Sequence, residues 1–354
     1  MKRLIIPIFV MNRGCPNRCV FCNERITAGA YPEFITKGYF KETVDAHLES
    51  AGKRFHETQI AFYGGSFTGM DTSYQETLLE YARPYIERGL VDSIRISTRP
   101  DYIDEEHLEF MQRRYVQTVE IGAQSLDNEV LERANRGHSA DDVKRATLLL
   151  KKKGFETGLH LMVGLPGDTK GGFLDTVAEV VSLKPHMVRI HPTIVFRDTD
   201  LGKMYRDGSY VPLTMEEAVE WSKRALIRFR KASIQVIRLG LHTTGEMTDD
   251  GNIIAGPFHP SFRSFVEGAL FLDMAASLLK RSKGLKHAVS FFVSPRDVSN
   301  MRGFRNINIS ILQKYYPDLD ITVRENHGQE RETLCLSIHG TEETYNTSFE
   351  NLLY

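Results

Sequence analysis

The stretch that organises the sequence is a short loop near its start, Gly14-Cys15-Pro16-Asn17-Arg18-Cys19-Val20-Phe21-Cys22-Asn23. It holds three of the four cysteines, separated by three residues and then by two. A tight loop with this spacing can turn three thiolates toward one point, as an iron–sulfur cluster or a zinc ion requires. Three ligands leave one metal position open, so the loop predicts a site for chemistry rather than a closed structural site.

Structural zinc and disulfides are the alternative uses of these cysteines. A closed zinc site needs a fourth ligand, and the remaining cysteine, Cys335, stands far along the chain without a second CxxC pair. Disulfides between Cys15 and Cys22 would close very small rings and leave one cysteine over. The first residues are too short an apolar run for a secretion signal. The clustered thiols therefore predict a reducing compartment, the cytoplasm.

Length and charge limit the classes of protein further. The chain has 354 residues and a formal net charge of −1. This balance gives no global attraction to nucleic acid, although a local basic patch is compatible with it. No apolar run approaches the length of a membrane span, so no membrane partner is expected.

Beyond the loop, short β-rich runs alternate with longer amphipathic runs. The predicted strands are 5–10, 58–63, 93–97, 118–122, 158–163 and 186–190. Alternation with helices implies parallel strands and right-handed crossovers. Six such units are too few for a closed eight-unit barrel. The expected fold class is therefore α/β, a partial (β/α)6 TIM-like barrel.

Polar and glycine-rich residues follow strand after strand in this series. In folds of this kind the loops after the strands' C-terminal ends carry the site. The candidates are the cysteine loop, Gly64-Gly65-Ser66, Ser97-Thr98-Arg99, Gln124-Ser125, His160 and His191.

Each of these candidates also has a purely structural interpretation. The glycine pair could only end a strand. Gln124 and Ser97 could cap the following helices. His160 and His191 could be core histidines of apolar strands.

The alternation of strand-like and helix-like runs is interrupted near residue 240. We expect a first domain over residues 1–240 and a smaller C-terminal α+β region over 241–354, of an ordinary domain size. Within that region the pattern predicts helices at 264–279 and 307–316 and strands at 289–293, 320–324 and 334–338.

Taken together, three motifs resemble the radical S-adenosylmethionine superfamily: the cysteine loop, Tyr63 to Thr68, and Gly122 to Asp127. The segments Gly158 to Gly167 and Ile190 to Thr199, with Ile234 to Arg238, are similar to the radical domain of the Elongator catalytic subunit. The resemblance covers the chain to about residue 240.

The resemblance implies a role for each motif. Cys15, Cys19 and Cys22 would ligate three irons of a 4Fe–4S cluster, and the fourth iron would chelate S-adenosylmethionine. Phe21 would lie against the adenine of that cofactor. A reductant such as flavodoxin or ferredoxin would supply an electron, and a 5′-deoxyadenosyl radical would abstract hydrogen from the substrate.

Other cofactor contacts follow from the related coproporphyrinogen oxidase-like enzymes. Gly64-Gly65-Ser66 would offer backbone groups to the methionine amino group, because residues without bulk permit close approach. Gln124 and Arg136 would reach the ribose and the carboxylate, although Arg136 could also be a solvated helix-end charge. Ser97 and His160 stand where those enzymes have acidic residues, so a contact with S-adenosylmethionine is expected of them on position alone. No role follows for His191 or Cys335.

The identity of the substrate stays open at this level. Elongator-type relatives modify a wobble uridine in tRNA with an acetyltransferase domain placed after the radical domain. The chain after residue 240 is too short for that domain and shows no acetyl-CoA pyrophosphate loop, so a different end product is expected. The hypotheses are a radical enzyme acting on tRNA or other RNA, one acting on a small molecule or tetrapyrrole, and an iron–sulfur sensor without turnover.

One feature of the C-terminal region favours RNA. A strand, a helix, the turn Gly303-Phe304-Arg305-Asn306 and a second helix are similar in order to a KH unit, which clamps a nucleic-acid backbone through a GXXG loop. Asn306 replaces the second glycine. Four cations could face phosphates or simply form a solvated surface: Arg296, Arg302, Arg305 and Lys314.

Overall fold

The computed structural model describes residues 3–11, 13–29, 31–52, 55–248, 251–282, 288–341 and 343–352. The chain forms two compact units, Met1–Leu213 with Ile234–Pro257, and Thr214–Ser233 with Phe258–Tyr354. Helix α9 (Met215–Lys231) therefore packs with the C-terminal unit, although it precedes the last strand of the first. The expected division into functional domains at residues 240 and 241 stays a prediction.

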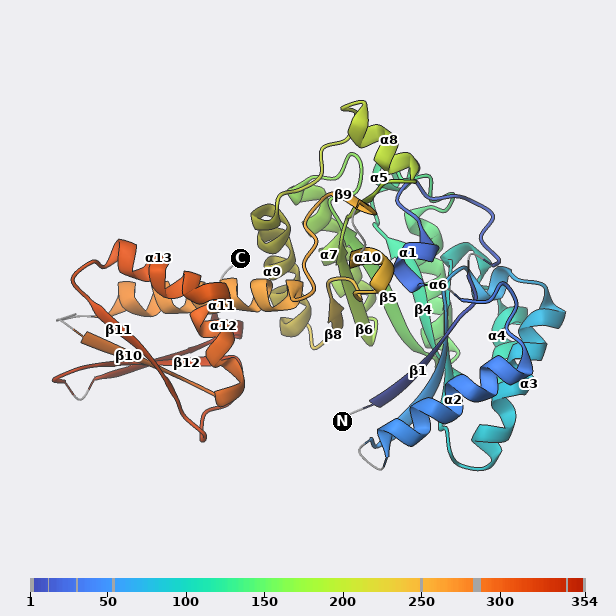
Figure 1. Cartoon of the computed structure of the whole chain (residues 1–354), viewed down its shortest axis with the longest axis horizontal. Helices are drawn as coiled ribbons and strands as arrows, with labels where there is room; N and C mark the ends of the chain where they lie inside the picture. The colour runs from blue at the N-terminus through green and yellow to red at the C-terminus, as the bar shows by residue number, and fades with distance from the viewer. Residues whose placement is uncertain are drawn as a thin grey trace. The chain divides into compact units, whose positions relative to one another are not determined.

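The first unit is built on one parallel sheet of seven strands in the order β1-β2-β3-β4-β5-β6-β8 (Figure 1). The sheet curves but does not close, because β1 and β8 are its two edges. This confirms the expected partial α/β barrel. The strands are β1 (Arg3–Phe9), β2 (Glu57–Tyr63), β3 (Ser93–Thr98), β4 (Val116–Gln124), β5 (Glu156–Val163), β6 (Met187–Pro192) and β8 (Gln235–Leu239).

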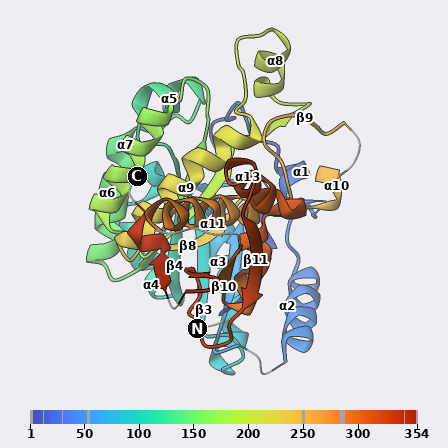
Figure 2. The ribbon, with the colours of Figure 1, turned by 90° about the vertical axis from the view of Figure 1, so that its left-hand side faces the viewer.

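Helices between the strands cover the sheet. In Figure 2, α6 and α7 lie to one side of the strands and α2 to the other. The main helices are α2 (Lys37–Ala51), α3 (Thr72–Glu87), α4 (Glu105–Gln112), α6 (Ala140–Lys152) and α7 (Lys170–Leu183). Shorter elements are α1 (Glu24–Ala28), α5 (Asn128–Arg133), α8 (Asp200–Arg206), α10 (Gly245–Thr248), and the antiparallel pair β7 (Val195–Phe196) and β9 (Ile253–Ala255).

Helix α6 shows why the sequence forms these elements. Ser139 and Asp142 make a reciprocal capping box at its start, which satisfies backbone N–H groups that lack partners within the helix. Val143, Ala146 and Leu150 then recur at helical spacing and are fully buried. The amphipathic periodicity of the sequence thus becomes the packing of the helix.

The seventh strand, β8, is a difference from the predicted six. Its five residues alternate between exposed, buried and half-buried positions, because it lies at the edge of the sheet. It therefore lacks the continuous apolar run that identifies a parallel strand buried on both faces.

The second unit is the smaller α+β region. Its four-stranded sheet has the order β11-β10-β12-β13, with β10 and β11 parallel and the other neighbours antiparallel. Helix α11 (Phe262–Arg281) packs on this sheet and on α9, and buries Val266, Leu270, Phe271 and Met274 (Figure 2). The other elements are β10 (Ala288–Val293), α12 (Val298–Arg302), α13 (Ile307–Tyr315), β11 (Asp320–Glu325), β12 (Thr333–Ile338) and β13 (Thr344–Ser348).

Across the described residues, no helix has the length and apolar character needed to cross a membrane.

The cysteine loop is fixed to the first unit by its backbone. Val20 donates its N–H to the carbonyl of Ala134 and accepts from the N–H of Leu201, at 3.1 and 2.8 Å. Its side chain lies in an apolar cluster with Ala134 and Leu201. At the other end of the loop, the N–H of Ser66 donates to the carbonyl of Arg13 at 2.7 Å. The loop is therefore held at both ends to segments that follow other strands.

We predict that Gly14→Ala destabilises this attachment. Gly14 has a φ of +73°, and a Cβ there would lie 2.6 Å from Gly69 C and Met70 N. Gly89 has a φ of +67° with open space around it, so Gly89→Ala is the matched control. The control should cost about 1–2 kcal/mol of the free energy of unfolding for its left-handed backbone. Gly14→Ala should cost roughly 1–3 kcal/mol more, because backbone atoms must move. Urea unfolding of both variants measures the difference, and equal costs would contradict the close contact.

Candidate active site

One cavity of about 2000 Å³ occupies the inner face of the seven-stranded sheet. The residues that line it come from the strands, from the loops after them and from α1, α8 and α10. Almost every residue that the sequence singled out lies on its wall: Cys15, Cys19, Phe21, Cys22, Gly64, Gly65, Ser97, Gln124, Arg136, His160 and His191. The shared location follows from the parallel sheet, which brings successive strand ends to one edge.

The three cysteines of the loop lie close enough to affect one another. Desolvation by the cavity wall raises the pKa of Cys15 to about 11, and the charges of Glu24 and Cys19 add to this rise. Desolvation, Glu24 and the other two thiols raise the pKa of Cys22 in the same way. Arg136 opposes both shifts, and its Nη1 donates to Cys19 Sγ at 2.9 Å. The loop thus gathers three thiols beside a permanent positive charge.

This donor set fits an iron–sulfur cluster. In the described part of the chain, no three His, Cys, Asp or Glu side chains are grouped as a site for a single metal ion. A cluster accepts one thiolate at each of several irons, so its cysteines surround it and do not converge on one ion. A set made only of soft sulfur ligands also favours such a cluster over hard cations. Cys15, Cys19 and Cys22 would hold it.

The glycine pair after β2 requires glycine for its backbone. Gly64 and Gly65 have φ values of +78° and +57°, a region that side chains with a Cβ rarely adopt. The N–H of Gly65 donates to the carboxylate of Glu24 on α1. Glu24 also lines the cavity and acts on two of the thiols, so it is a site residue that the sequence reasoning missed. Its place two residues after Cys22 is the only signal in the sequence.

Ser66 differs from its neighbours because it is fully buried and does not line the cavity. Its Oγ lies 2.9 Å from Thr98 Oγ1 and accepts from the N–H of Arg99 at 3.2 Å. Since its own N–H donates to Arg13, both polar groups join the end of β2 to neighbouring segments. The expected contact of Ser66 with S-adenosylmethionine stays a prediction. The geometry does not favour it, because the N–H and the hydroxyl of Ser66 already have partners in the protein.

Arg136 and Gln124 lie at the end of β4. Arg136 Nη2 donates to the carbonyl of Gly122 at 2.6 Å, in addition to its bond with Cys19. Gln124 has a left-handed backbone with a φ of +69°, which is uncommon for a residue with a side chain. Arg136 therefore connects the cysteine loop to β4. The proposed ribose and carboxylate contacts of the two residues stay predictions, as does that of Ser97.

A buried carboxylate, Glu120 on β4, organises the middle of the cavity wall. Arg95 Nη1 and Arg189 Nη2 donate to its Oε1 at 2.8 and 2.9 Å, and the Tyr63 hydroxyl donates at 2.8 Å. Its Oε2 lies 2.5 Å from His160 Nε2. Burial opposes the charge, yet Arg189, His160 and Arg95 outweigh it and hold the pKa of Glu120 well below its usual range. We call Glu120 and these four partners the Glu120 cluster.

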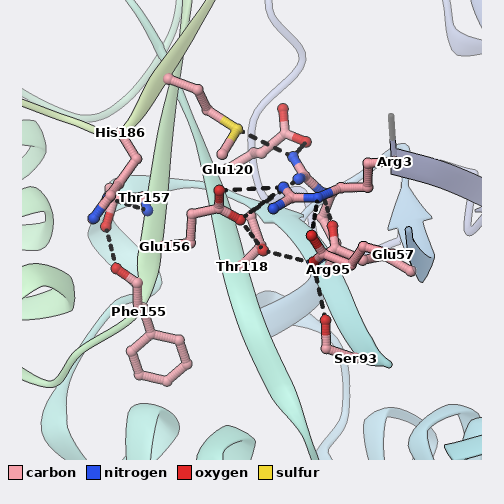
Figure 3. Close-up of polar contacts among 12 residues, drawn as sticks. Arg3, Glu57, Ser93, Arg95, Thr118, Glu120, Phe155, Glu156, Thr157 and His186 are labelled. Carbon is pink, nitrogen blue, oxygen red and sulfur yellow. Dashed lines mark hydrogen bonds and ion pairs between the residues drawn. The ribbon is translucent and has the colours of Figure 1, made fainter. Parts of the chain in front are cut away.

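The cluster continues toward the other end of the strands. Figure 3 shows Arg95 between Glu120 and Glu156, with Arg3 and Glu57 beside them. Arg3 donates to Glu57 at 2.8 Å and to Glu156 at 2.9 Å. This part of the barrel interior is thus lined by paired charges, whereas apolar layers fill a closed barrel.

The two histidines have different surroundings. His160 belongs to the Glu120 cluster, so its expected contact with S-adenosylmethionine stays a prediction while its Nε2 faces a carboxylate. His191 packs edge-on against it with ring centroids 6.0 Å apart. The Nδ1 of His191 is buried without a hydrogen-bond partner in the described residues. Burial, followed by His160 and Arg189, lowers the pKa of His191 well below its usual value, which favours a neutral ring.

The fold and the cavity together define a class: an open parallel α/β barrel with a three-cysteine loop on the wall of a large cavity. Comparison with known families agrees with this description. Residues 9–180 match the family model "Radical SAM superfamily", and residues 185–271 match "Radical_SAM C-terminal domain". The chain belongs to the radical SAM superfamily.

Individual relatives are similar over part of the chain. A tRNA uridine(34) acetyltransferase of Methanocaldococcus jannaschii is 33% identical over 255 residues, which are 61% of this chain and 47% of the relative. Human Elongator complex protein 3 is 27% identical over 51% of this chain and 36% of its own length. The chain thus spans about half or less of these curated relatives.

A solved structure supports the fold. The archaeal Methanocaldococcus infernus Elp3 with an N-terminal deletion superposes with a TM-score of 0.60 at 21% identity, covering 77% of this chain and 63% of that chain. At this identity the likeness concerns the fold. The expected resemblance to the Elongator catalytic subunit is confirmed.

We predict that Glu120→Gln destabilises the first unit by about 3–5 kcal/mol, because it leaves buried Arg95 and Arg189 without their carboxylate. Glu129→Gln is the control, since its pair with Arg133 is exposed and worth about 0.5 kcal/mol or less. Guanidinium unfolding at neutral pH measures both values.

The same variant has a pH signature. The unfolded chain takes up a proton at Glu120 near pH 4.5, whereas the folded chain keeps this group ionised to lower pH. The stability from Glu120 is therefore complete above pH 4.5 and is lost as the pH falls below it. The difference in the free energy of unfolding between the parent and Glu120→Gln should become smaller as the pH falls. A constant gap from pH 6 to pH 3.5 would contradict the lowered pKa.

Proposed function

We propose that this protein is a radical S-adenosylmethionine enzyme that modifies RNA, most directly tRNA. The observation that carries the proposal is the cavity wall, which combines the three-cysteine loop with glycine-ended and polar-ended strands. When bound, a 4Fe–4S cluster and S-adenosylmethionine supply a 5′-deoxyadenosyl radical that takes a hydrogen atom from a substrate.

The residues of the chain would bind and orient these groups. Cys15, Cys19 and Cys22 would hold the cluster, and Arg136 keeps Cys19 beside the end of β4. Phe21 offers an aromatic face to the adenine from the same loop. Gly64 and Gly65 have no side chains, so they would let the amino acid moiety approach the backbone next to Glu24. An external reductant such as flavodoxin or ferredoxin supplies the electron.

Two observations favour RNA as the substrate. Two relatives whose similarity covers about half of this chain or more are named tRNA uridine(34) acetyltransferases. In addition, exposed arginines stand along the cavity wall, and none of them has a carboxylate partner in the part of the chain that the structure describes: Arg18, Arg25, Arg197 and Arg206. Uncompensated cations around an opening attract a polyanion and raise its local concentration.

The second unit offers a further RNA contact. Strand β10, helix α12, the turn 303–306, helix α13 and strand β11 follow in the order expected for a KH-like unit. Gly303, Arg305 and Asn306 all have positive φ, so the turn projects its backbone, and Phe304 is 51% exposed. The cations on these elements are exposed and have no acidic partner among the described residues: Arg296, Arg302, Arg305 and Lys314. A projecting turn among unpaired cations suits contact with phosphates.

We predict that the anaerobically reconstituted protein converts S-adenosylmethionine to 5′-deoxyadenosine with dithionite, and that tRNA stimulates the product. Cys22→Ala should lose the charge-transfer absorption of the cluster and the product together. Cys335→Ala is the control and should keep both, because Cys335 lies on β12 of the second unit. An intact cluster that gives no 5′-deoxyadenosine would favour a sensor without turnover. Stimulation by small-molecule extracts but not by tRNA would favour a small-molecule or tetrapyrrole substrate.

The RNA contact of the second unit has its own test. Charge reversal by Arg302→Glu with Arg305→Glu should weaken tRNA binding at least tenfold and lower the salt dependence of the affinity, because fewer counterions are released. Arg113→Glu serves as the control, since Arg113, the residue that follows α4, is exposed but lies in the first unit outside the cavity. Equal affinities for the two variants, measured by electrophoretic shift at two salt concentrations, would exclude the KH-like contact.

A further inference from the structure

A guanidinium group without a counter-ion lines the cavity. Arg238, on β8, is half-buried, and its guanidinium makes no hydrogen bond or ion pair with any described residue. The other arginines along the sheet differ from it. Arg95 and Arg189 bind Glu120, Arg3 binds Glu57 and Glu156, and Arg99 binds Asp101. Among the arginines on the described strands of this sheet, Arg238 is thus the exception, because Arg3, Arg95 and Arg189 each contact a carboxylate.

The surroundings of Arg238 add to its positive charge. It stands opposite Arg189 in the register of β6 and β8. Burial, and then repulsion by Arg189, lowers the pKa of Arg238. His242 lies near it, and burial followed by the charge of Arg238 lowers the pKa of that ring. The charge of Glu120 raises the pKa of Arg238 without a hydrogen bond between the two side chains. Both carboxylate oxygens of Glu120 already have partners in the Glu120 cluster.

A neutral histidine completes this part of the wall. The charge of Arg238 acts on His191, and the buried Nδ1 of His191 lacks a partner among the described residues. Partial burial of an uncompensated charge and of an unsatisfied ring nitrogen both cost stability. Unsatisfied polar groups that converge on a cavity are typical of a site that awaits a ligand.

We propose that Arg238, with His191 and His242 beside it, forms a subsite for an oxyanion of the substrate, a phosphate or a carboxylate group. A guanidinium fork suits either group because it can donate two parallel hydrogen bonds. This inference rests on the proposed function, since it names the chemical group by which the substrate of the same cavity is held.

The location separates this subsite from the expected cofactor contacts. Those contacts lie on β1 to β5 or in the loops after them, whereas Arg238 lies on β8, the edge strand beyond β6. Because the barrel is open, this edge of the sheet is not closed by another strand. A substrate that enters past the exposed arginines could therefore place an anionic group on Arg238 and direct another part of itself toward the cysteine loop.

The first experiment measures anion binding by the full-length chain. Inorganic phosphate should raise the melting temperature of the parent more than chloride does at equal ionic strength. Arg238→Gln should weaken phosphate binding, measured by calorimetry, by roughly tenfold or more, because a charged hydrogen-bonding pair is lost. Arg238→Lys should retain part of the affinity. Arg113→Gln is the matched control and should bind phosphate like the parent, because Arg113, the exposed residue that follows α4, lies outside the cavity.

The second experiment separates the two sources of the oxyanion. If the group is an RNA phosphate, Arg238→Gln should weaken tRNA binding and reduce the slope of log affinity against log salt by about one. If the group belongs to a small molecule, the affinity for tRNA should stay unchanged while that for inorganic phosphate falls. Either result supports the subsite and assigns its ligand.

Two results would overturn the inference. One is an unchanged affinity of Arg238→Gln for inorganic phosphate. The other is a loss of affinity for S-adenosylmethionine equal to the loss for phosphate, because Arg238 would then be a cofactor contact. The variant should also melt no lower than the parent without phosphate, since it removes an unpaired charge, and a lower melting temperature would indicate a structural role.

The test is independent of the proposed chemistry. Reconstituted Arg238→Gln should lose the stimulation of 5′-deoxyadenosine formation by substrate. If the parent protein forms no 5′-deoxyadenosine, the proposed function fails, while the phosphate measurements still decide the anion subsite.

Discussion

The buried carboxylate of Glu120 is the interaction on which the first unit depends. An open barrel must line its concave face with something other than a dry core, because this face remains accessible as a cavity. The Glu120 cluster solves this by crosslinking β2, β3, β5 and β6 to β4 through hydrogen-bonded charges. Each partner satisfies the others, so the wall can be polar and still rigid.

This rigidity positions the cysteine loop. The loop has little regular structure, and its geometry comes from bonds to the segments after β2, β4 and β6. Arg136 joins the end of β4 directly to a thiol. Precise placement of loop residues on a rigid scaffold is what a site for a reactive group needs. The loop that we propose as the site of the chemistry is therefore one that the scaffold holds in place.

The sequence predicted the class of fold because strand and helix periodicities are local properties. The alternation of strands and helices placed six strands correctly. It also predicted that the candidate residues gather at the strand ends, and nearly all of them line the one cavity. The edge strand β8 escaped because its burial is mixed. Ser66 illustrates the limit for side chains. It belongs to the same motif as Gly64 and Gly65, yet its hydroxyl is buried in the protein and bonds with Thr98.

By itself, the sequence determined the cysteine spacing, the glycines at the strand end and the parallel order, because these depend on neighbouring residues and on backbone sterics. Only the tertiary structure decided which charges are neutralised. Glu24, Glu120 and Arg238 are ordinary charged residues in the sequence. Their roles arise only when segments distant in the sequence come together. Glu24 then lies beside the thiols, Glu120 is surrounded by cations, and Arg238 is left without a carboxylate. Electrostatic pairing depends on distance through space, and separation along the chain does not reveal it.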